Sequence, residues 1–190
     1  MKANRSGGFE IKGLLAKAET EKQRSLSPLR IIGIDPGLAS TGWGLVDASG
    51  GRIRYVAHGC IETKADVSRA DRLLFIYRSV QSLVREWKPL ESAMETLYFG
   101  RNVSSAMAVA EARGVIIIAL AGAGLEIREF TPNQIKNGVV GVSRADKRQV
   151  QEMVRIILGL KEIPKPDHAS DALGAAICAA HAGETPLKQR

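Results

Sequence analysis

Three acidic residues stand where the surrounding sequence is apolar. Asp35 ends the run Ile31–Ile34 and is followed at once by Pro-Gly, Glu95 ends a second apolar stretch, and Asp171 lies within "PDHASDALGAAICAAH". Burying an unpaired charge is costly, so proteins avoid it unless the group is paired or holds a metal. Three carboxylates that met would also raise one another's pKa. A divalent cation removes that repulsion, and oxygen ligands select Mg²⁺ or Mn²⁺.

Metal-bound carboxylates suit one reaction in particular. Two divalent ions about 4 Å apart stabilise both the attacking and the leaving oxygens of a phosphodiester displacement. The chain has 27 Lys and Arg against 20 Asp and Glu, a net charge of +7, which favours a polyanionic partner. Together these features predict a nuclease. The alternative is that the acids are local: Asp35 starts a turn, Glu95 faces water and Asp171 pairs with a lysine.

For the acids to meet, the elements that carry them must be neighbours. Apolar patterning predicts an α/β protein, in which an antiparallel three-strand meander is followed by alternating strands and helices. The expected strands are Arg30–Asp35, Trp43–Asp47, Arg52–Glu62, Leu90–Glu95 and Leu125–Phe130. The expected helices run from a Ser68 cap to about Trp87, over Asn102–Gly122, from Thr131-Pro132, from a Ser143 cap to about Leu158, and, after Pro166, to about His181. If the first and fourth strands are adjacent, Asp35 and Glu95 emerge at one sheet edge, and the last helix brings Asp171 to them.

The chain is expected to hold a single domain over residues 30–183. Residues 1–29 are polar and basic and form an N-terminal extension, either disordered or a short helix, and residues 184–190 form a loose tail. Cys60 and Cys178 have no metal-ligand spacing and are expected to be free thiols of a cytoplasmic protein. No apolar run has the roughly 20 residues of a membrane span, and the N-terminus has no signal-peptide core.

Four sequence blocks occur in the order of a known family. They are "GIDPG…TGWG", "AMETLYFGRNVSSAMAVAEARG", "PNQIKNGVVGVSRADKRQVQEMVRIIL" and "PDHASDALGAAICAAH". From about Arg30 to His181 the chain resembles the RuvC-type Holliday-junction resolvases, or crossover junction endodeoxyribonucleases. The resemblance implies a ribonuclease-H-like fold with a five-stranded mixed sheet flanked by helices. It also implies a structure-selective, Mg²⁺-dependent endodeoxyribonuclease of DNA recombination and repair.

The same resemblance implies partners and products. A homodimer would place paired hydrolytic nicks in opposed strands of a four-way DNA junction, because two identical cuts need two identical sites. The nicks would leave 5′-phosphates, each site would use two Mg²⁺ ions, and a branch-migration complex of the RuvA and RuvB type would be a partner. The small-residue helix after Ser104 fits a subunit interface through Ala106, Ala108, Ala110, Ala112 and Gly114, unless it packs only on its own sheet.

Site residues carry over position by position. The family's catalytic, metal-binding acids match Asp35, Glu95 and Asp171, and a fourth position, commonly aspartate, is His168 here. An aromatic residue near the exchange point matches Tyr98, with Phe99 beside it, where stacking on a splayed base is the physical rationale. Two lysines of the family's DNA face match Lys136 and Lys147, and Arg101, Asn102 and Arg144 lie on the adjoining predicted loops. Phosphate contacts are the interpretation of these residues, and a plain solvated face is the alternative.

The fourth ligand has two candidates, because both Asp167 and His168 share a helix face with Asp171. Helix chemistry favours His168. Asp167 is expected to precede the helix and to cap its free N–H groups, which leaves His168 as the first helical residue. An imidazole nitrogen is a softer ligand than a carboxylate, so Mn²⁺ should be tolerated at least as well as Mg²⁺. Activity should fall as the pH drops toward about 6, because a protonated imidazole cannot bind metal.

Two other classes of protein share some of these sequence features. A non-catalytic junction-binding module would have lost an acid, whereas the positions of Asp35, Glu95 and Asp171 are all acidic. The stretch "GIDPGLASTGWG" is also similar to the phosphate loop of actin-like ATP-binding proteins. That fold needs a second domain and a second phosphate loop, and this sequence offers neither.

Overall fold

The five strands form one mixed sheet, as expected. The computed structural model describes residues 28–96 and 103–183. The strands are β1 (Leu29–Asp35), β2 (Ser40–Ser49), β3 (Arg52–Glu62), β4 (Glu91–Glu95) and β5 (Glu126–Phe130). Their order in the sheet is β3-β2-β1-β4-β5. The first three strands are an antiparallel meander, and β4 and β5 add in parallel to β1.

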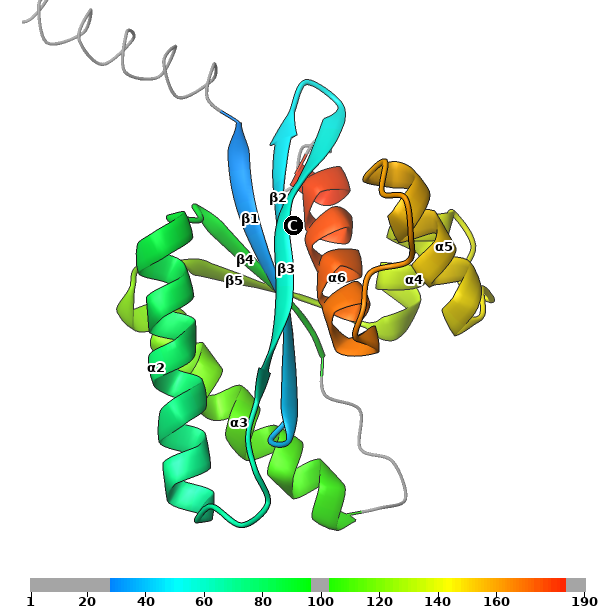
Figure 1. Cartoon of the computed structure of the whole chain (residues 1–190). Coiled ribbons are helices and arrows are strands. Elements are labelled where there is room, and N and C mark those ends of the chain that lie inside the picture. Colours follow the sequence, from blue (N-terminus) through cyan, green and yellow to red (C-terminus); the bar gives the residue numbers. More distant parts are fainter. Residues whose placement is uncertain (1–27, 97–102, 184–190) are drawn as a thin grey trace, which may run out of the picture.

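Helices cover both faces of the sheet (Figure 1). One face carries α2 (Arg69–Trp87) and α3 (Val103–Gly122), whose inward side chains pack on Ile32, Ile34 and Met94. The other carries α4 (Pro132–Val140), α5 (Lys147–Ile157) and α6 (Asp167–Gly183). The innermost of these is α6, which contacts β1 and β2 directly and has most of its side chains buried. The sheet is therefore a central layer between two apolar cores.

Two local expectations about element boundaries were wrong. The second strand is twice as long as expected, because it pairs along its whole length with β3 and over residues 42–48 with β1. The helix expected to begin at a Ser143 cap begins instead after Asp146. The carboxylate of Asp146 accepts the N–H of Gln149, and the Gln149 side chain accepts the N–H of Asp146. The chain turns at Ser143 because Ala145 is buried in the core before the helix starts.

The last helix also begins one residue earlier than expected. Asp167 is its first residue, and the carbonyl of Pro166 accepts the N–H groups of Ala169 and Ser170. The expectation that Asp167 caps this helix from outside was therefore wrong. Its carboxylate instead makes an ion pair with Lys147 on α5. The other caps are as expected: Ser68 caps α2, and Thr131 caps α4 with Pro132 in the first turn.

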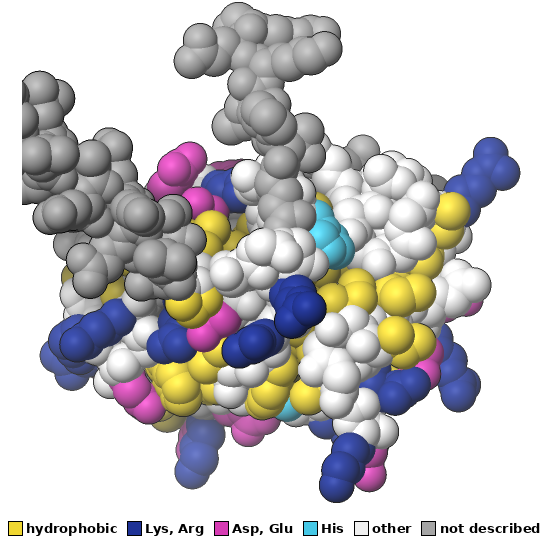
Figure 2. Space-filling model, turned by 90° about the horizontal axis from the view of Figure 1, so that it is seen from above, with side chains coloured by type: hydrophobic (Ala, Val, Ile, Leu, Met, Phe, Trp, Pro, Cys, Tyr) yellow, Lys and Arg dark blue, Asp and Glu magenta, His cyan; other side chains and the backbone are white. Residues whose placement is uncertain are grey.

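Figure 2 shows the end of the sheet where β1 begins, which is uppermost in Figure 1. Lys and Arg side chains are spread over this face among acidic and hydrophobic ones and do not gather into one basic patch. Within the described part of the chain, no helix has the length and hydrophobicity that crossing a bilayer requires. The expected extension lies outside the described residues except for its last two, and the tail from 184 lies wholly outside them.

Candidate active site

The parallel pairing of β1 and β4 brings Asp35 and Glu95 together. Ile34 is opposite Met94 in the register, so the two acids come next on neighbouring strands. Successive strand residues face opposite sides of a sheet. Ile34 and Met94 point into the core beneath α2 and α3, so Asp35 and Glu95 point to the α6 side. Pairing and alternation together thus place both carboxylates at one edge, facing α6.

Glycines let α6 lie unusually close to this face. A Cβ added to Gly33 would stand 1.9 Å from the carbonyl oxygen of Ala172, and one added to Gly42 would stand 2.0 Å from that of His168. Neither position tolerates a side chain without moving the helix. Since Gly42 is the register partner of Asp35, the backbone of His168 is held directly beside the first acid.

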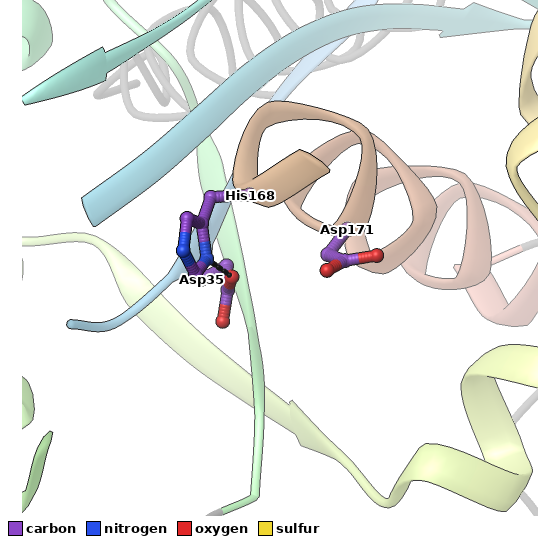
Figure 3. A group of neighbouring side chains, drawn as sticks. All are labelled: Asp35, His168 and Asp171. Carbon is purple, nitrogen blue, oxygen red and sulfur yellow. Dashed lines mark hydrogen bonds and ion pairs between the residues drawn. The ribbon is translucent and has the colours of Figure 1, made fainter. Parts of the chain in front are cut away.

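Three side chains converge at the start of α6. Nδ1 of His168 lies 2.6 Å from Oδ2 of Asp35, and Asp171 lies one helical turn further on, on the same side of α6 (Figure 3). One ligand atom from each of Asp35, His168 and Asp171 lies within 4.8 Å of the other two. Asp167, the rejected candidate for the fourth ligand, is not part of this group.

Glu95 stands next to this trio without belonging to it. It lines two adjoining hollows. One is shared with Lys136, Lys147 and Asp171, and the other with Asp35 and His168. A ligand held between the two hollows would be in reach of carboxylates from β1, β4 and α6. The structure therefore gathers the four expected metal-binding residues around one place, with His168 beside Asp35.

Without a bound cation, the ionised forms of the acids at the site are unfavourable. Burial raises the pKa of Asp35, and the charge of Asp171 adds to this, although the hydrogen bond with His168 works in the opposite direction. Burial also raises the pKa of Glu95, and the charges of Asp35 and Asp171 raise it further. Both shifts mean that the negative forms of these acids are unfavourable here until positive charge is supplied.

Lys147 supplies part of that positive charge. Its Nζ lies 3.1 Å from Oδ2 of Asp171 and 3.3 Å from Oδ2 of Asp167. Burial alone would lower the pKa of Lys147, but the contacts with Asp171 and Asp167 outweigh it and leave that pKa raised. The alternative noted from the sequence, that Asp171 pairs with a lysine, is therefore realised. It does not exclude a metal site, because the same carboxylate also faces Asp35 and His168.

Two supporting residues were not predicted from the sequence. Arg113 of α3 donates from its guanidinium to the backbone carbonyl of Glu95, 2.8 Å away, and makes an ion pair with Glu129. The fully buried Thr41 donates its hydroxyl to the carbonyl of Gly37 at 2.7 Å, which closes the loop after Asp35. Both fix the strand ends that carry the acids. Neither has a clear sequence signal, because each acts on a backbone carbonyl rather than on a side chain that a motif would mark.

Three of the expected DNA-binding residues lie in the part of the chain that the structure describes. Lys136 and Lys147 line the same hollow as Glu95 and Asp171. Arg144 is exposed in the turn before α5. The remaining ones, Tyr98, Phe99, Arg101 and Asn102, lie outside the described residues.

The donor set fits a hard divalent ion. Two carboxylates and one imidazole are ligands that Mg²⁺ and Mn²⁺ accept, and the imidazole shifts the preference toward Mn²⁺. Ligands at about 2.1 Å from a metal are about 3 Å apart when adjacent and about 4.2 Å apart when opposite. The separations in the trio are close to this range, so small side-chain movements suffice for binding.

A sheet in this strand order, with acids from two adjacent parallel strands and from a helix laid across them, defines a ribonuclease-H-like nuclease. The description "Crossover junction endodeoxyribonuclease RuvC" belongs to the family model that matches residues 31–179. The chain belongs to this RuvC family. The family, the fold and the nuclease class predicted from the sequence are thereby confirmed.

Individual relatives agree along most of their length. The RuvC protein of Treponema denticola is 48% identical over 172 residues, which cover 90% of this chain and 95% of that protein. Among solved structures, Thermus thermophilus RuvC in complex with Holliday junction substrate has a TM-score of 0.78 at 32% identity, covering 82% of this chain and 94% of that one. The yeast mitochondrial resolvase Ydc2, at 10% identity and a TM-score of 0.60, shares the fold. Neither the actin-like nor the non-catalytic alternative is favoured by these matches.

Proposed function

We propose that the protein resolves four-way DNA junctions by metal-dependent hydrolysis, placing one nick in each of two opposed strands. The observation that carries this is the convergence of Asp35, His168 and Asp171, with Glu95 beside them, on one face of a nuclease fold. A bound divalent cation would supply Lewis-acid activation of water and would neutralise charge on the phosphate. We infer Mg²⁺ as the ion, two per site, with Mn²⁺ tolerated, and products that carry 5′-phosphates.

The chain's own residues prepare the site for this chemistry. Asp35, Glu95 and Asp171 offer carboxylate oxygens from three different elements, so the ligands are held by the fold rather than by a flexible loop. His168 fixes the orientation of Asp35 through the hydrogen bond between Nδ1 and Oδ2. Lys136 and Lys147 at the same hollow would hold a DNA phosphate beside the acids.

The proposed dimer has an exposed surface on α3 that includes Gly114 but only part of the residues expected. Ala106 and Ala112 are buried in the protein's own core, so the expectation that they meet a partner subunit was wrong. Met107, Gly114 and Ile118 share the opposite face: both large side chains are more than half exposed, and Gly114 has open space around it. Leu74 and Phe75 of the adjacent α2 are also exposed. We infer that this apolar surface joins two copies, because paired nicks need paired sites.

Two further elements of the proposal concern the cellular setting. A resolvase acts on junctions that another assembly moves along DNA, so we include a branch-migration complex of the RuvA and RuvB type as a partner. Cys60 and Cys178 are free thiols, which agrees with a reducing compartment, and we propose the cytoplasm.

The test is cleavage of a mobile four-way junction compared with a linear duplex of the same sequence, with and without Mg²⁺. We expect paired nicks in the junction only, only with metal, and ligase-sealable products. Equal cutting of the duplex, or cutting in the presence of a chelator, would contradict the proposal. Light scattering on wild type and Ile118→Glu tests the dimer: the wild type should have twice the mass of the variant.

A further inference from the structure

Lys147 stands in an unexpected electrostatic position. It is the first residue of α5, followed by Arg148, and the first turn of this helix carries no acidic residue. A cation at a helix N-terminus opposes the helix dipole and is unfavourable by roughly 0.3–1 kcal/mol. The carboxylate of Asp146 caps α5, and a second helix adds two more negative charges: the ammonium group lies between Asp167 and Asp171, one turn apart on α6. The side chain of Lys147 is therefore held by the site and not only by its own helix.

The two carboxylates that hold Lys147 differ in their surroundings. Asp171 is partly buried, with 29% of its side chain exposed, and one of its oxygens lies within the trio that faces Asp35 and His168. Asp167 is 65% exposed and is outside that trio. Of the two partners, only Asp171 is therefore also offered to a cation at the site.

We propose that Lys147 and the metal ion compete for Asp171, and that Asp167 keeps the displaced ammonium group beside the site. This inference rests on the proposed metal-dependent function. An ammonium group has three N–H donors. Two are occupied by Asp171 and Asp167 before metal binds, and the arrival of metal at Asp171 releases one of them. The released donor faces the hollow shared with Glu95 and Lys136, where a DNA phosphate would lie.

The competition makes metal binding and phosphate binding mutually supportive. A phosphate that draws Lys147 away from Asp171 leaves that carboxylate free for metal, and a metal on Asp171 leaves Lys147 free for phosphate. Such coupling is reciprocal by thermodynamic necessity. In this scheme Asp167 is a positioning residue. Without it, a Lys147 displaced from Asp171 would have no second carboxylate on α6 to bind, and it would therefore resist displacement.

The experiment measures Mn²⁺ binding by calorimetry in the absence of DNA, so it does not depend on catalysis. Lys147→Met should bind Mn²⁺ more tightly than wild type by roughly fivefold, the upper end for an exposed ion pair. Lys136→Met is the matched control, because Lys136 lines the same hollow but makes no ion pair with the acids among the described residues. We expect a change below about twofold there. Equal gains in both variants would overturn the proposal, because they would indicate only general repulsion between lysines and metal.

The role of Asp167 is tested in two backgrounds. Asp167→Asn should weaken Mn²⁺ binding by roughly threefold when Lys147 is present and should change nothing in the Lys147→Met protein. The same loss in both backgrounds would overturn the positioning role, because Asp167 would then act on the metal directly. Junction cleavage by the wild type is assayed separately. If the junction is cut while the Mn²⁺ shifts are missing, only this inference fails; if Mn²⁺ binds as stated and no junction is cut, only the proposed function fails.

Discussion

Nδ1 of His168, at the start of α6, and Oδ2 of Asp35, at the end of β1, lie 2.6 Å apart. The two residues are 133 positions apart in the sequence. An ionised carboxylate only accepts hydrogen bonds, so Nδ1–H of His168 donates to Oδ2 of Asp35. A metal ion bound to both atoms would hold them about 3 Å apart. The Nδ1 proton and a metal ion therefore occupy the same position in turn, so metal binding at Nδ1 requires the neutral tautomer of His168 that carries its proton on Nε2.

The acids of the two parallel strands should be essential for cutting and dispensable for binding. Asp35→Asn and Glu95→Gln each remove a ligand charge while leaving Lys136 and Lys147 in place. We expect cleavage to be abolished and junction affinity in gel-shift assays to stay within a few fold of wild type. Retained cleavage by either variant would remove that residue from the active site.

His168 and Asp167 should have separable roles. His168→Ala should lose most cleavage with both Mg²⁺ and Mn²⁺, because it deletes a ligand and the partner of Asp35. Asp167→Ala should keep most of its cleavage at saturating metal, because that carboxylate contacts Lys147 and lies outside the ligand trio. Metal titrations of the nicking rate distinguish the two. If Asp167→Ala is inactive at every metal concentration and His168→Ala is active, the ligand assignment must be reversed.

Removing the charge of Glu95 should stabilise the metal-free protein. The folded-state pKa of Glu95 is raised, so at neutral pH its ionised form opposes folding. This penalty disappears as the pH falls through the folded-state pKa toward the unfolded value. Glu95→Gln should therefore raise the melting temperature in a chelator at pH 7 to 8, and the gain should shrink in acid.

An acid with the opposite shift provides the control for this measurement. The pKa of Glu152 is lowered by its hydrogen bond with Arg155, so Glu152→Gln should not raise the melting temperature. Added Mn²⁺ should stabilise the wild type and the Glu152→Gln protein more than Glu95→Gln. A Glu95→Gln protein that melts below wild type in chelator would contradict the electrostatic account of the site.

The contribution of Lys136 and Lys147 should be measurable in the salt dependence of junction binding. If Lys136 and Lys147 each contact one phosphate, replacing either by alanine should lower the slope of log affinity against log salt by about 1. The measurement is made in chelator so that the junction stays intact. Unchanged slopes in both variants would mean that these lysines are merely solvated.

A single methyl group at Gly42 should disrupt the site. The added Cβ would stand 2.0 Å from the carbonyl of His168, so α6 must move away from Asp35. We expect a loss of about 1–3 kcal/mol in stability, as for overpacked cores, and weaker Mn²⁺ binding. Gly114→Ala is the matched control: it lies in a helix interior with open space around it and should gain up to about 1 kcal/mol. Comparable destabilisation of both variants would refute the close-approach argument.

Much of this arrangement could be predicted from the sequence. Apolar patterning located four of the five strands to within one residue, whereas the adjacency of β1 and β4 was only a condition of the hypothesis, which the structure meets. From that adjacency the meeting of Asp35 and Glu95 follows. The capping argument favoured His168 over Asp167 as the ligand, and the geometry places His168 with Asp35, although the cap itself was misplaced.

The rest of the arrangement depends on distances between helices and strands, which the hydrophobic pattern of a sequence does not specify. Nothing in the residue types of Gly33 and Gly42 says that a helix backbone will lie against them, since isolated glycines also occur in loops and bulges. The contacts of Arg113 with Glu95 and of Lys147 with Asp167 join side chains from different elements, whose relative orientation is fixed only by packing. The division of α3 into a buried alanine side and an exposed face could likewise not be predicted from the sequence, because its residues are apolar on both sides.

The position of α6 in the chain has a consequence for the order of folding. This helix is the last described element, and it brings His168 and Asp171 across more than 130 residues to the end of β1. Domains made on the ribosome fold as the chain emerges, and contacts between distant residues form late. The sheet with α2 and α3 can therefore form first, whereas α4 and α5 pack on α6 and depend on it. The proposed ligand set is complete only once α6 has docked, so a nascent or truncated chain without α6 should be unable to cut DNA.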